Sequence, residues 1–132
     1  MEKFSLEIVT PIKNFKIEDI DYLRCPGMDG EFGIMNEHIN GIFGLAVGEL
    51  KILTKDKNKY YATGGGFLEI MGDRVKLLLE SVEKSSDIDT QRANNSLERA
   101  KLRKAKKESN LNHKRAELSL VRALNRLKVS KR

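Results

Sequence analysis

The sequence predicts a β + α fold, with an N-terminal antiparallel β-sandwich in residues 1–84 and a C-terminal antiparallel two-helix hairpin in residues 85–132. Two observations predict it. Every Gly, Pro and aromatic residue of the 132-residue chain lies at or before Gly72. Residues 87–132 carry 14 Lys and Arg against 5 Asp and Glu, whereas the remainder has 11 basic and 14 acidic residues. Turn-forming residues therefore belong to one part and positive charge to the other.

Composition bounds the class of protein. A chain of 132 residues amounts to about one domain. Aromatic residues make up only 6%, with no Trp, so we expect a mainly aliphatic core. No apolar run approaches the roughly 20 residues that span a bilayer, and the first residues lack the pattern of a signal peptide. We therefore expect a cytosolic chain, or one held peripherally on a cytosolic surface.

The first strands are indicated by alternation. Apolar side chains occupy every second position near the start of the chain, at Phe4, Leu6 and Ile8. Thr10-Pro11 ends this strand. A looser strand pattern runs over residues 17–25, and residues 26–30 (PGMDG) form a turn because Pro fixes φ and Gly accepts positive φ.

Glycines and polar tips divide the rest of the first part. Gly41, Gly44 and Gly48 separate short apolar stretches, and residues 55–58 (KDKN) are a polar hairpin tip. Gly72-Asp73 suits a two-residue hairpin loop. Short strands with a turn signal every ten residues or so are typical of an antiparallel sandwich or a barrel.

Three features suggest chemistry but favour plainer interpretations. Gly64-Gly65-Gly66 lacks the Lys-Ser/Thr of a phosphate loop, which favours close backbone packing or a bulge. His38 and His113 have no partners at metal-ligand spacing, and no Ser/His/Asp or Cys/His arrangement is defensible, so we expect neither a metal nor catalysis. Cys25 is alone, which excludes an internal disulfide and favours a buried small hydrophobe over a reactive thiol.

The first helix is predicted from about 88 to 107. Residues 85–89 (SSDID) supply N-cap side chains and first-turn acids, and good helix formers follow. At about 100° per residue, a narrow apolar face comprises Ala93, Leu97 and Ala100. A basic stripe lies beside it, formed by Arg92, Arg99, Arg103 and Lys106.

A second helix is predicted from about 112 to 128, after an interruption at residues 108–110. Its predicted apolar face comprises Ala116, Leu120, Ala123, Leu124 and Leu127. Its basic residues are predicted roughly opposite, at Arg115, Arg122 and Arg126. The short link predicts antiparallel neighbours, and alanines on both faces would allow close approach.

Such a hairpin buries little surface by itself and depends on packing against something else. We therefore expect it to be mobile, able to dock in more than one place. A single Lys or Arg could simply be solvated. The dense set predicts an acidic partner, which could be nucleic acid, nucleotide phosphates or an acidic protein surface.

Five motifs in order resemble one known family. They are residues 6–11 (LEIVTP), 26–35 (PGMDGEFGIM) followed by His38, 48–50 (GEL), 65–70 (GGFLEI) and 88–93 (IDTQRA). Together they span essentially the whole chain. The set resembles the epsilon subunit of bacterial F-type ATP synthase, a family with a β-sandwich followed by two helices.

The resemblance implies a non-catalytic rotor subunit of the central stalk in a proton- or sodium-translocating complex. The sandwich would bind the gamma subunit and rest on the ring of c subunits, peripherally at the cytoplasmic face of the plasma membrane. Glu31 matches the family position that faces the ring, and His38 is a weaker candidate. Asn36-Glu37 stands where a common form of the family has Pro-Gly before this histidine, so the chain departs from the family pattern at this point.

The resemblance also implies that the hairpin regulates. Folded on the sandwich it would permit turnover, and extended toward the catalytic alpha and beta subunits it would block ATP hydrolysis, with its basic stripe meeting acidic segments of beta. ATP is the implied regulatory ligand. Its implied site comprises Glu83, Ile88, Asp89, Arg92, Ala93, Arg99, Arg122 and Arg126. The alternative is that Asp89 and Arg92 only organise the helix start, while the other arginines face water or beta.

A nucleic-acid-binding protein with a basic helical tail is the alternative function. Its binding would weaken steeply with salt, because phosphate contacts release counterions. The basic region lacks the interleaved aromatic residues that stack on single-stranded bases. That absence favours the rotor subunit.

Overall fold

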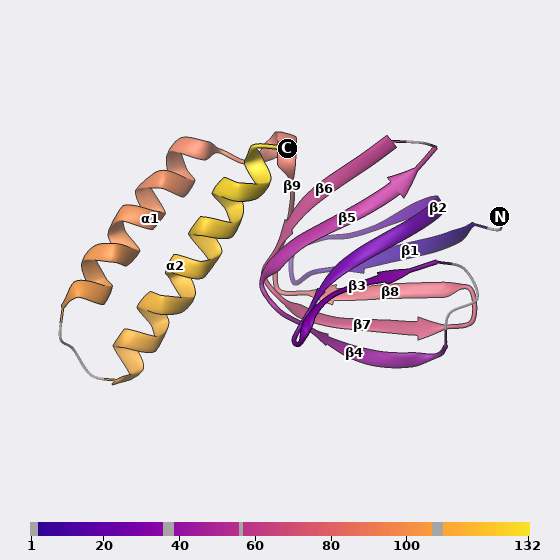
Figure 1. Ribbon diagram of the computed structural model, residues 1–132, viewed down its shortest axis with the longest axis horizontal. Coiled ribbons are helices and arrows are strands. Elements are labelled where there is room, and N and C mark those ends of the chain that lie inside the picture. The colour runs from indigo at the N-terminus through magenta and orange to yellow at the C-terminus, as the bar shows by residue number, and fades with distance from the viewer. Residues whose placement is uncertain (1–2, 36–38, 56, 107–109) are drawn as a thin grey trace.

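The computed structural model describes residues 3–35, 39–55, 57–106 and 110–132. Strands come first and helices second, and the helices stand beside one end of the strands (Figure 1). The strands are β1 (Phe4–Val9), β2 (Asn14–Gly27), β3 (Gly30–Ile34), β4 (Gly41–Leu45), β5 (Gly48–Thr54), β6 (Lys57–Thr63), β7 (Gly66–Met71), β8 (Arg74–Leu79) and β9 (Val82–Lys84). The helical elements are the 3₁₀ turn η1 (Ser85–Asp87), α1 (Thr90–Ala105) and α2 (Asn110–Ser130).

The long strand β2 joins the two layers of the sandwich. Its first half pairs with β1, and its second half pairs with β3 and β5. β1 also pairs with β8, and the order continues through β7 and β4 back to β2. Figure 1 shows β5 and β6 in one layer and β8, β7 and β4 in the other. The predicted sandwich is confirmed, with its two layers joined by continuous strand pairing. The pairing of β1 with β8 is parallel, which the local pattern of the sequence does not reveal.

The core follows the predicted alternation. Phe4, Leu6 and Ile8 are all buried, while the residues between them are more exposed. Cys25 is fully buried in the same core, and burial raises the pKa of its thiol to about 12. The interpretation of Cys25 as a buried hydrophobe is confirmed, because a thiol that stays protonated is a poor nucleophile. The largest fully buried side chains of the sandwich are otherwise aliphatic: Leu6, Ile8, Ile20, Leu23, Ile34, Leu50, Ile52, Leu68 and Leu77.

Two of the glycine signals have clear structural causes. Gly72 has φ +63° in the two-residue turn between β7 and β8, as predicted. Gly66 has φ +151°, and a Cβ there would overlap the carbonyl oxygen of Leu78. The triple glycine therefore allows close backbone packing. The turn between β2 and β3 is tighter than the predicted 26–30, because Pro26 and Gly27 still pair with β3 and only Met28 and Asp29 form the turn.

Both predicted helices are present, with shifted ends. α1 begins at Thr90, because the Asp89 side chain caps it by accepting a hydrogen bond from the backbone N–H of Arg92 at 3.1 Å. α2 extends beyond the predicted range at both ends, from Asn110 to Ser130. The seam between the helices is formed by alanines with 0–2% exposure, Ala93, Ala100, Ala116 and Ala123. Small side chains there bring the helices close, as predicted.

The predicted faces of α2 need two corrections. Leu124 is 49% exposed, so it lies outside the apolar seam. Arg126 does not point away from the packed side, because it pairs with Glu83 at the end of the sandwich. The helical period places Arg122 and Arg126 about 100° from the seam, rather than opposite it. α2 therefore has two packed faces, an alanine face toward α1 and a polar face toward the sandwich.

Candidate functional site between the hairpin and the sandwich

One helix of the hairpin docks on the sandwich. α2 packs against η1, β5 and β6, and α1 lies on the far side of α2 (Figure 1). The apolar part of this contact is small. It consists of buried Val129 with Ala62 and Ile88, and half-buried Tyr60 packs beside them. So few apolar groups bury little surface. The other contacts described below between the hairpin and the sandwich are hydrogen bonds and ion pairs.

A cleft of about 500 Å³ opens between α2 and the strands. Glu83, Arg122 and Arg126 all line it. The Arg126 guanidinium donates to both carboxylate oxygens of Glu83, with Nε–Oε1 at 2.8 Å and Nη2–Oε2 at 3.1 Å. The hydrogen bond with Glu83 raises the pKa of Arg126, against an opposing effect of burial. This bidentate ion pair connects the hairpin to β9.

A second hollow, of about 270 Å³, lies between the two helices. Its basic lining residues are Arg99 and Arg103 from α1 with Arg122 and Arg126 from α2. Arg99 donates to Ser96 Oγ at 3.1 Å. We call these four residues the arginine groove. Like charges gathered in a concave surface favour an anion. Arg103 was not among the predicted site residues, although it belongs to the predicted basic stripe that also contains Arg99.

The start of α1 supplies no lining residue to the arginine groove. Ile88 is buried in the small apolar cluster, and Ala93 is buried in the helix seam. Asp89 caps α1. The Arg92 side chain is exposed and lines neither of the two hollows. Of the predicted site residues, the structure thus brings together Glu83, Arg99, Arg122 and Arg126. The remaining four form or flank the first turn of α1.

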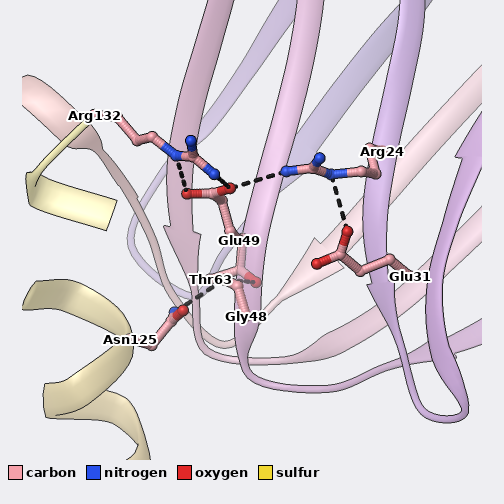
Figure 2. Close-up of polar contacts among 7 residues, drawn as sticks. All are labelled: Arg24, Glu31, Gly48, Glu49, Thr63, Asn125 and Arg132. Atoms are coloured by element: carbon pink, nitrogen blue, oxygen red, sulfur yellow. Dashed lines mark hydrogen bonds and ion pairs between the residues drawn. The ribbon is translucent and has the colours of Figure 1, made fainter. Parts of the chain in front are cut away.

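Glu49 forms a third polar contact, although in the sequence it stood out only within the motif GEL and not as a site residue. Its side chain is 4% exposed. Arg132 donates to both of its oxygens, with Nε–Oε2 at 2.9 Å and Nη2–Oε1 at 2.8 Å, and Arg24 Nη2 donates to Oε1 at 2.9 Å. Figure 2 shows Glu49 between the two guanidinium groups. Strand alternation puts Leu50 in the core and Glu49 on the outer face, where a charged side chain is ordinarily solvated. The hairpin covers it instead.

The electrostatics of Glu49 follow from this arrangement. Burial pushes the pKa of Glu49 up. The hydrogen bond from Arg132 and the charges of Arg132 and Arg24 outweigh burial, so the net shift is downward. Next to it, Asn125 Nδ2 donates to the Gly48 carbonyl oxygen at 2.9 Å (Figure 2). Arg132 also lies over the Tyr60 ring, 4.5 Å from its centroid. Several polar contacts from α2 and Arg132 thus converge on the start of β5.

Glu31, the predicted ring contact, lies beside the turn between β2 and β3. Its side chain is 55% exposed, and its Oε2 lies 3.2 Å from Arg24 Nε. That nitrogen is buried and makes an ion pair without hydrogen-bond geometry. His38, the weaker candidate, lies outside the described residues.

The outer face of β4, β7 and β8 carries apolar side chains. Phe67 is 55% exposed and pairs with Leu78, which is 38% exposed. Ile42 on β4 is 72% exposed and Met71 on β7 is 62% exposed. We call these four residues the outer strip. Strand register places the paired Glu69 and Lys76 beside Ile42, between Phe67 and Met71. Exposed apolar side chains grouped on one sheet face are typical of a protein interface.

The described residues contain neither a membrane-spanning helix nor a metal-binding cluster. Neither α1 nor α2 is long and apolar enough to cross a bilayer. The described His, Cys, Asp and Glu side chains form no cluster of three or more that could hold a metal ion. His113, predicted to have no metal role, pairs with Glu117 one helical turn away, at 3.0 Å.

Comparison with known proteins identifies the family. Residues 3–85 match the model of the ATP synthase delta/epsilon chain β-sandwich domain, and residues 86–131 match that of the long α-helix domain. The ATP synthase epsilon chain of Nitratidesulfovibrio vulgaris is 41% identical over 130 residues, covering 98% of this chain and 97% of the relative. That of Halalkalibacterium halodurans is 40% identical over 134 residues and covers both chains fully.

Solved structures show the same fold at lower identity. A chain of the Euglena gracilis mitochondrial ATP synthase (OSCP/F1/c-ring) aligns with a TM-score of 0.81 at 18% identity, covering 96% of this chain and 80% of that one. A chain of the Tetrahymena thermophila mitochondrial ATP synthase central stalk and c-ring aligns with a TM-score of 0.65 at 12% identity, covering 98% and 97%. On the evidence of the two domain models and the full-length relatives, this chain belongs to the ATP synthase epsilon-chain family, whose members are non-catalytic subunits of that complex.

Proposed function

We propose that this chain is a rotor subunit of the central stalk, coupling rotation of a c ring to the catalytic head. We propose further that its hairpin inhibits ATP hydrolysis when released from the sandwich, and that ATP stabilises the folded hairpin. The observation that carries the proposal is the contrast between a large apolar sandwich core and a small, mostly polar hairpin contact. A contact of that kind can open without unfolding the sandwich.

Release of the hairpin would expose basic side chains that an acidic partner can bind. Arg126 and Arg132 are both paired with sandwich carboxylates in the folded state. Once released, they would join the basic residues of α1 and α2 as an uncompensated positive surface. An acidic segment of a beta subunit is the proposed acceptor, because opposite surface charges attract and align partners.

ATP is proposed to bind where the two helices and β9 meet. The arginine groove supplies guanidinium groups from both helices, and guanidinium matches phosphate oxygens well. The adjoining cleft of about 500 Å³ shares Arg122 and Arg126 with the groove and adds Glu83. A ligand that contacts both helices and the sandwich binds only the folded hairpin, and it therefore stabilises that state by mass action.

The sandwich supplies the proposed anchoring surfaces. The outer strip offers apolar contact area suited to the gamma subunit, and exposed Glu31 is the proposed contact to polar loops of the c ring. Attachment through the ring would hold the chain peripherally at the cytoplasmic face of the plasma membrane.

Calorimetric titration of the protein with ATP tests the nucleotide proposal. We expect saturable heat for the parent, and at least a tenfold weaker binding for Arg126→Ala and Arg99→Ala, because each removes a charge-assisted phosphate contact worth roughly 1.5–3 kcal/mol. Arg115→Ala is the matched control, since Arg115 lies on exposed α2 surface outside both hollows. No heat at millimolar ATP, or equal affinity in all four proteins, would contradict the proposal.

ATPase measurements on the reconstituted complex test inhibition. Deleting residues 88–132 should raise the hydrolysis rate while assembly with gamma stays intact. An unchanged or lower rate in a fully assembled complex would count against an inhibitory hairpin. Loss of co-purification with gamma after Phe67→Asp tests the outer strip separately, with Glu80→Gln at the exposed position after β8 as control.

A further inference from the structure

Four charged residues alternate in sign from the end of the hairpin to the surface of the sandwich. Arg132 pairs with Glu49, Glu49 pairs with Arg24, and Arg24 pairs with Glu31. Figure 2 shows the four side chains in this order. The first belongs to the segment after α2, and the last lies beside the turn between β2 and β3. A continuous relay thus joins the docked hairpin to the exposed Glu31 carboxylate.

We propose that this relay couples docking of the hairpin to the state of Glu31. Docking of Arg132 on Glu49 favours the pairing of Arg24 with Glu31. A partner whose hydrogen-bond donors or cations draw Glu31 away from Arg24 favours release of the hairpin. The inference rests on the proposed function, in which the hairpin moves and Glu31 faces the ring.

The charges around Glu49 differ between the docked and the released state. In the docked state, two guanidinium groups alternate with two carboxylates, and both oxygens of Glu49 are engaged. In the released state, Glu49 and Glu31 share Arg24 alone. Glu49 has the shorter contact to Arg24, 2.9 Å against 3.2 Å for Glu31. Glu31 is also 55% exposed, so water can solvate it. Arg24 therefore turns to Glu49, and Glu31 becomes free.

Thermodynamic linkage makes the effect reciprocal. If release of the hairpin frees Glu31, then capture of Glu31 must favour release by the same factor. With Glu31 withdrawn, Arg24 and Arg132 face one carboxylate, and their mutual repulsion opposes docking.

Neighbouring contacts make the relay part of docking itself. Asn125 donates a hydrogen bond to the carbonyl oxygen of Gly48, one residue before Glu49, and the Arg132 guanidinium lies over the Tyr60 ring. Departure of α2 would remove these contacts together with the Arg132–Glu49 pair. Arg132 therefore does not need to be released independently of the helix.

The relay predicts the effects of three substitutions on the ratio of docked to released hairpin: two lower it and one raises it. Arg132→Gln lowers the ratio of docked to released hairpin about two- to fivefold, the range of an exposed ion pair. Glu31→Gln lowers the same ratio about twofold, although Glu31 has no described contact with the hairpin. Arg24→Gln raises the ratio, because Arg24 no longer neutralises Glu49 in the released state and Arg132 becomes its guanidinium partner. The charge of Glu31 also attracts Arg132 directly, so an effect of Glu31→Gln that persists in full in the Arg24→Gln protein would show direct attraction rather than the relay.

The distribution of distances between two spin labels reports the ratio of docked to released hairpin. Labels at Asn58→Cys on β6 and Leu118→Cys on α2 both occupy exposed positions. Cys25 does not compete for the reagent, because it is fully buried with a pKa of about 12. Asp29→Asn removes a charge near Glu31, and Lys131→Gln removes one beside Arg132. Neither control residue has an ion pair among the described contacts.

A double-mutant cycle decides the outcome. We expect Glu31→Gln to lower the docked ratio in the parent and to have no effect once Arg132→Gln is present. Equal effects of Glu31→Gln in both backgrounds would overturn the coupling, as would a change no larger than that of Asp29→Asn. A lower ratio in a folded Arg24→Gln protein would also overturn it. Both cycle residues are exposed, so the cycle stays decisive if Arg24→Gln does not fold.

The test separates this inference from the proposed function. The cycle uses the protein alone, so it can succeed even if the hairpin proves not to inhibit hydrolysis. Conversely, ATPase activity of the truncated complex can rise as proposed while the cycle shows no coupling.

Discussion

The sandwich and the hairpin bury different kinds of atoms. The sandwich encloses large aliphatic side chains such as Leu23, Ile52 and Leu77, each with no exposed surface. The hairpin seam is made of alanines and Leu97, and its contact with the sandwich relies on Asn125, Arg126 and Arg132. Apolar burial contributes about 25 cal/mol per Å² of apolar surface and is insensitive to charge. Ion pairs at a surface contribute little and depend on salt and pH. One part is therefore suited to be a fixed body and the other to be a switch.

Truncation in the sandwich core should have the largest effect. Leu77→Ala leaves a cavity among fully buried neighbours and should lower the free energy of unfolding by about 3 kcal/mol. Urea denaturation followed by circular dichroism measures this loss. Leu102→Ala on α1, where the side chain is 66% exposed, is the matched control and should change stability by less than about 0.5 kcal/mol. Similar losses in the two variants would erase the proposed contrast between the regions.

Removal of a docking ion pair should have a smaller and more local effect. Arg126→Ala deletes the two-pronged contact with Glu83 and should weaken docking by no more than about 1 kcal/mol, because the pair is partly exposed. Hydrogen exchange should quicken in α2 and stay unchanged in β5 and β7. Arg115→Ala should alter neither. Faster exchange throughout the strands after Arg126→Ala would show that hairpin and sandwich open as one unit.

Acid should weaken docking within a defined window. The folded protein holds the pKa of Glu49 below its ordinary value of 4.5. The ionised Glu49 therefore stabilises the docked state fully above that value, and this contribution is lost as pH falls through the lower folded pKa. The spin-label distance should accordingly stay constant from pH 7 to about pH 5 and lengthen below it. Glu49→Gln should lower docking at neutral pH and flatten this acid response. A parent response centred well above pH 5 would point to another group.

The sequence predicts the sandwich well because its signals are local. Alternation at Phe4, Leu6 and Ile8 and the turn at Gly72-Asp73 depend on neighbouring residues alone, and both are confirmed. The parallel pairing of β1 with β8 is missed, because strands distant in sequence leave no local trace of their pairing.

The candidate site is only partly predictable, for a similar reason. The arginines of one stripe, such as Arg99 and Arg103, can be grouped by helical period, and the family resemblance draws attention to Glu83 and Arg126. Glu49 is missed because strand period places it on the outer face, where a charged side chain is ordinarily solvated. Only the tertiary position of Arg132 shows that the hairpin covers it. Contacts between the two parts thus depend on docking, which local patterns do not specify.

Native-state hydrogen exchange shows whether the hairpin opens independently of the sandwich. We expect amides of α1 and α2 to exchange through an opening with lower free energy than amides of β2, β5 and β7, and added salt to lower the helical value alone. If helices and core strands instead exchange with one common free energy at low and high salt, the hairpin is not an independently released element and the account is wrong.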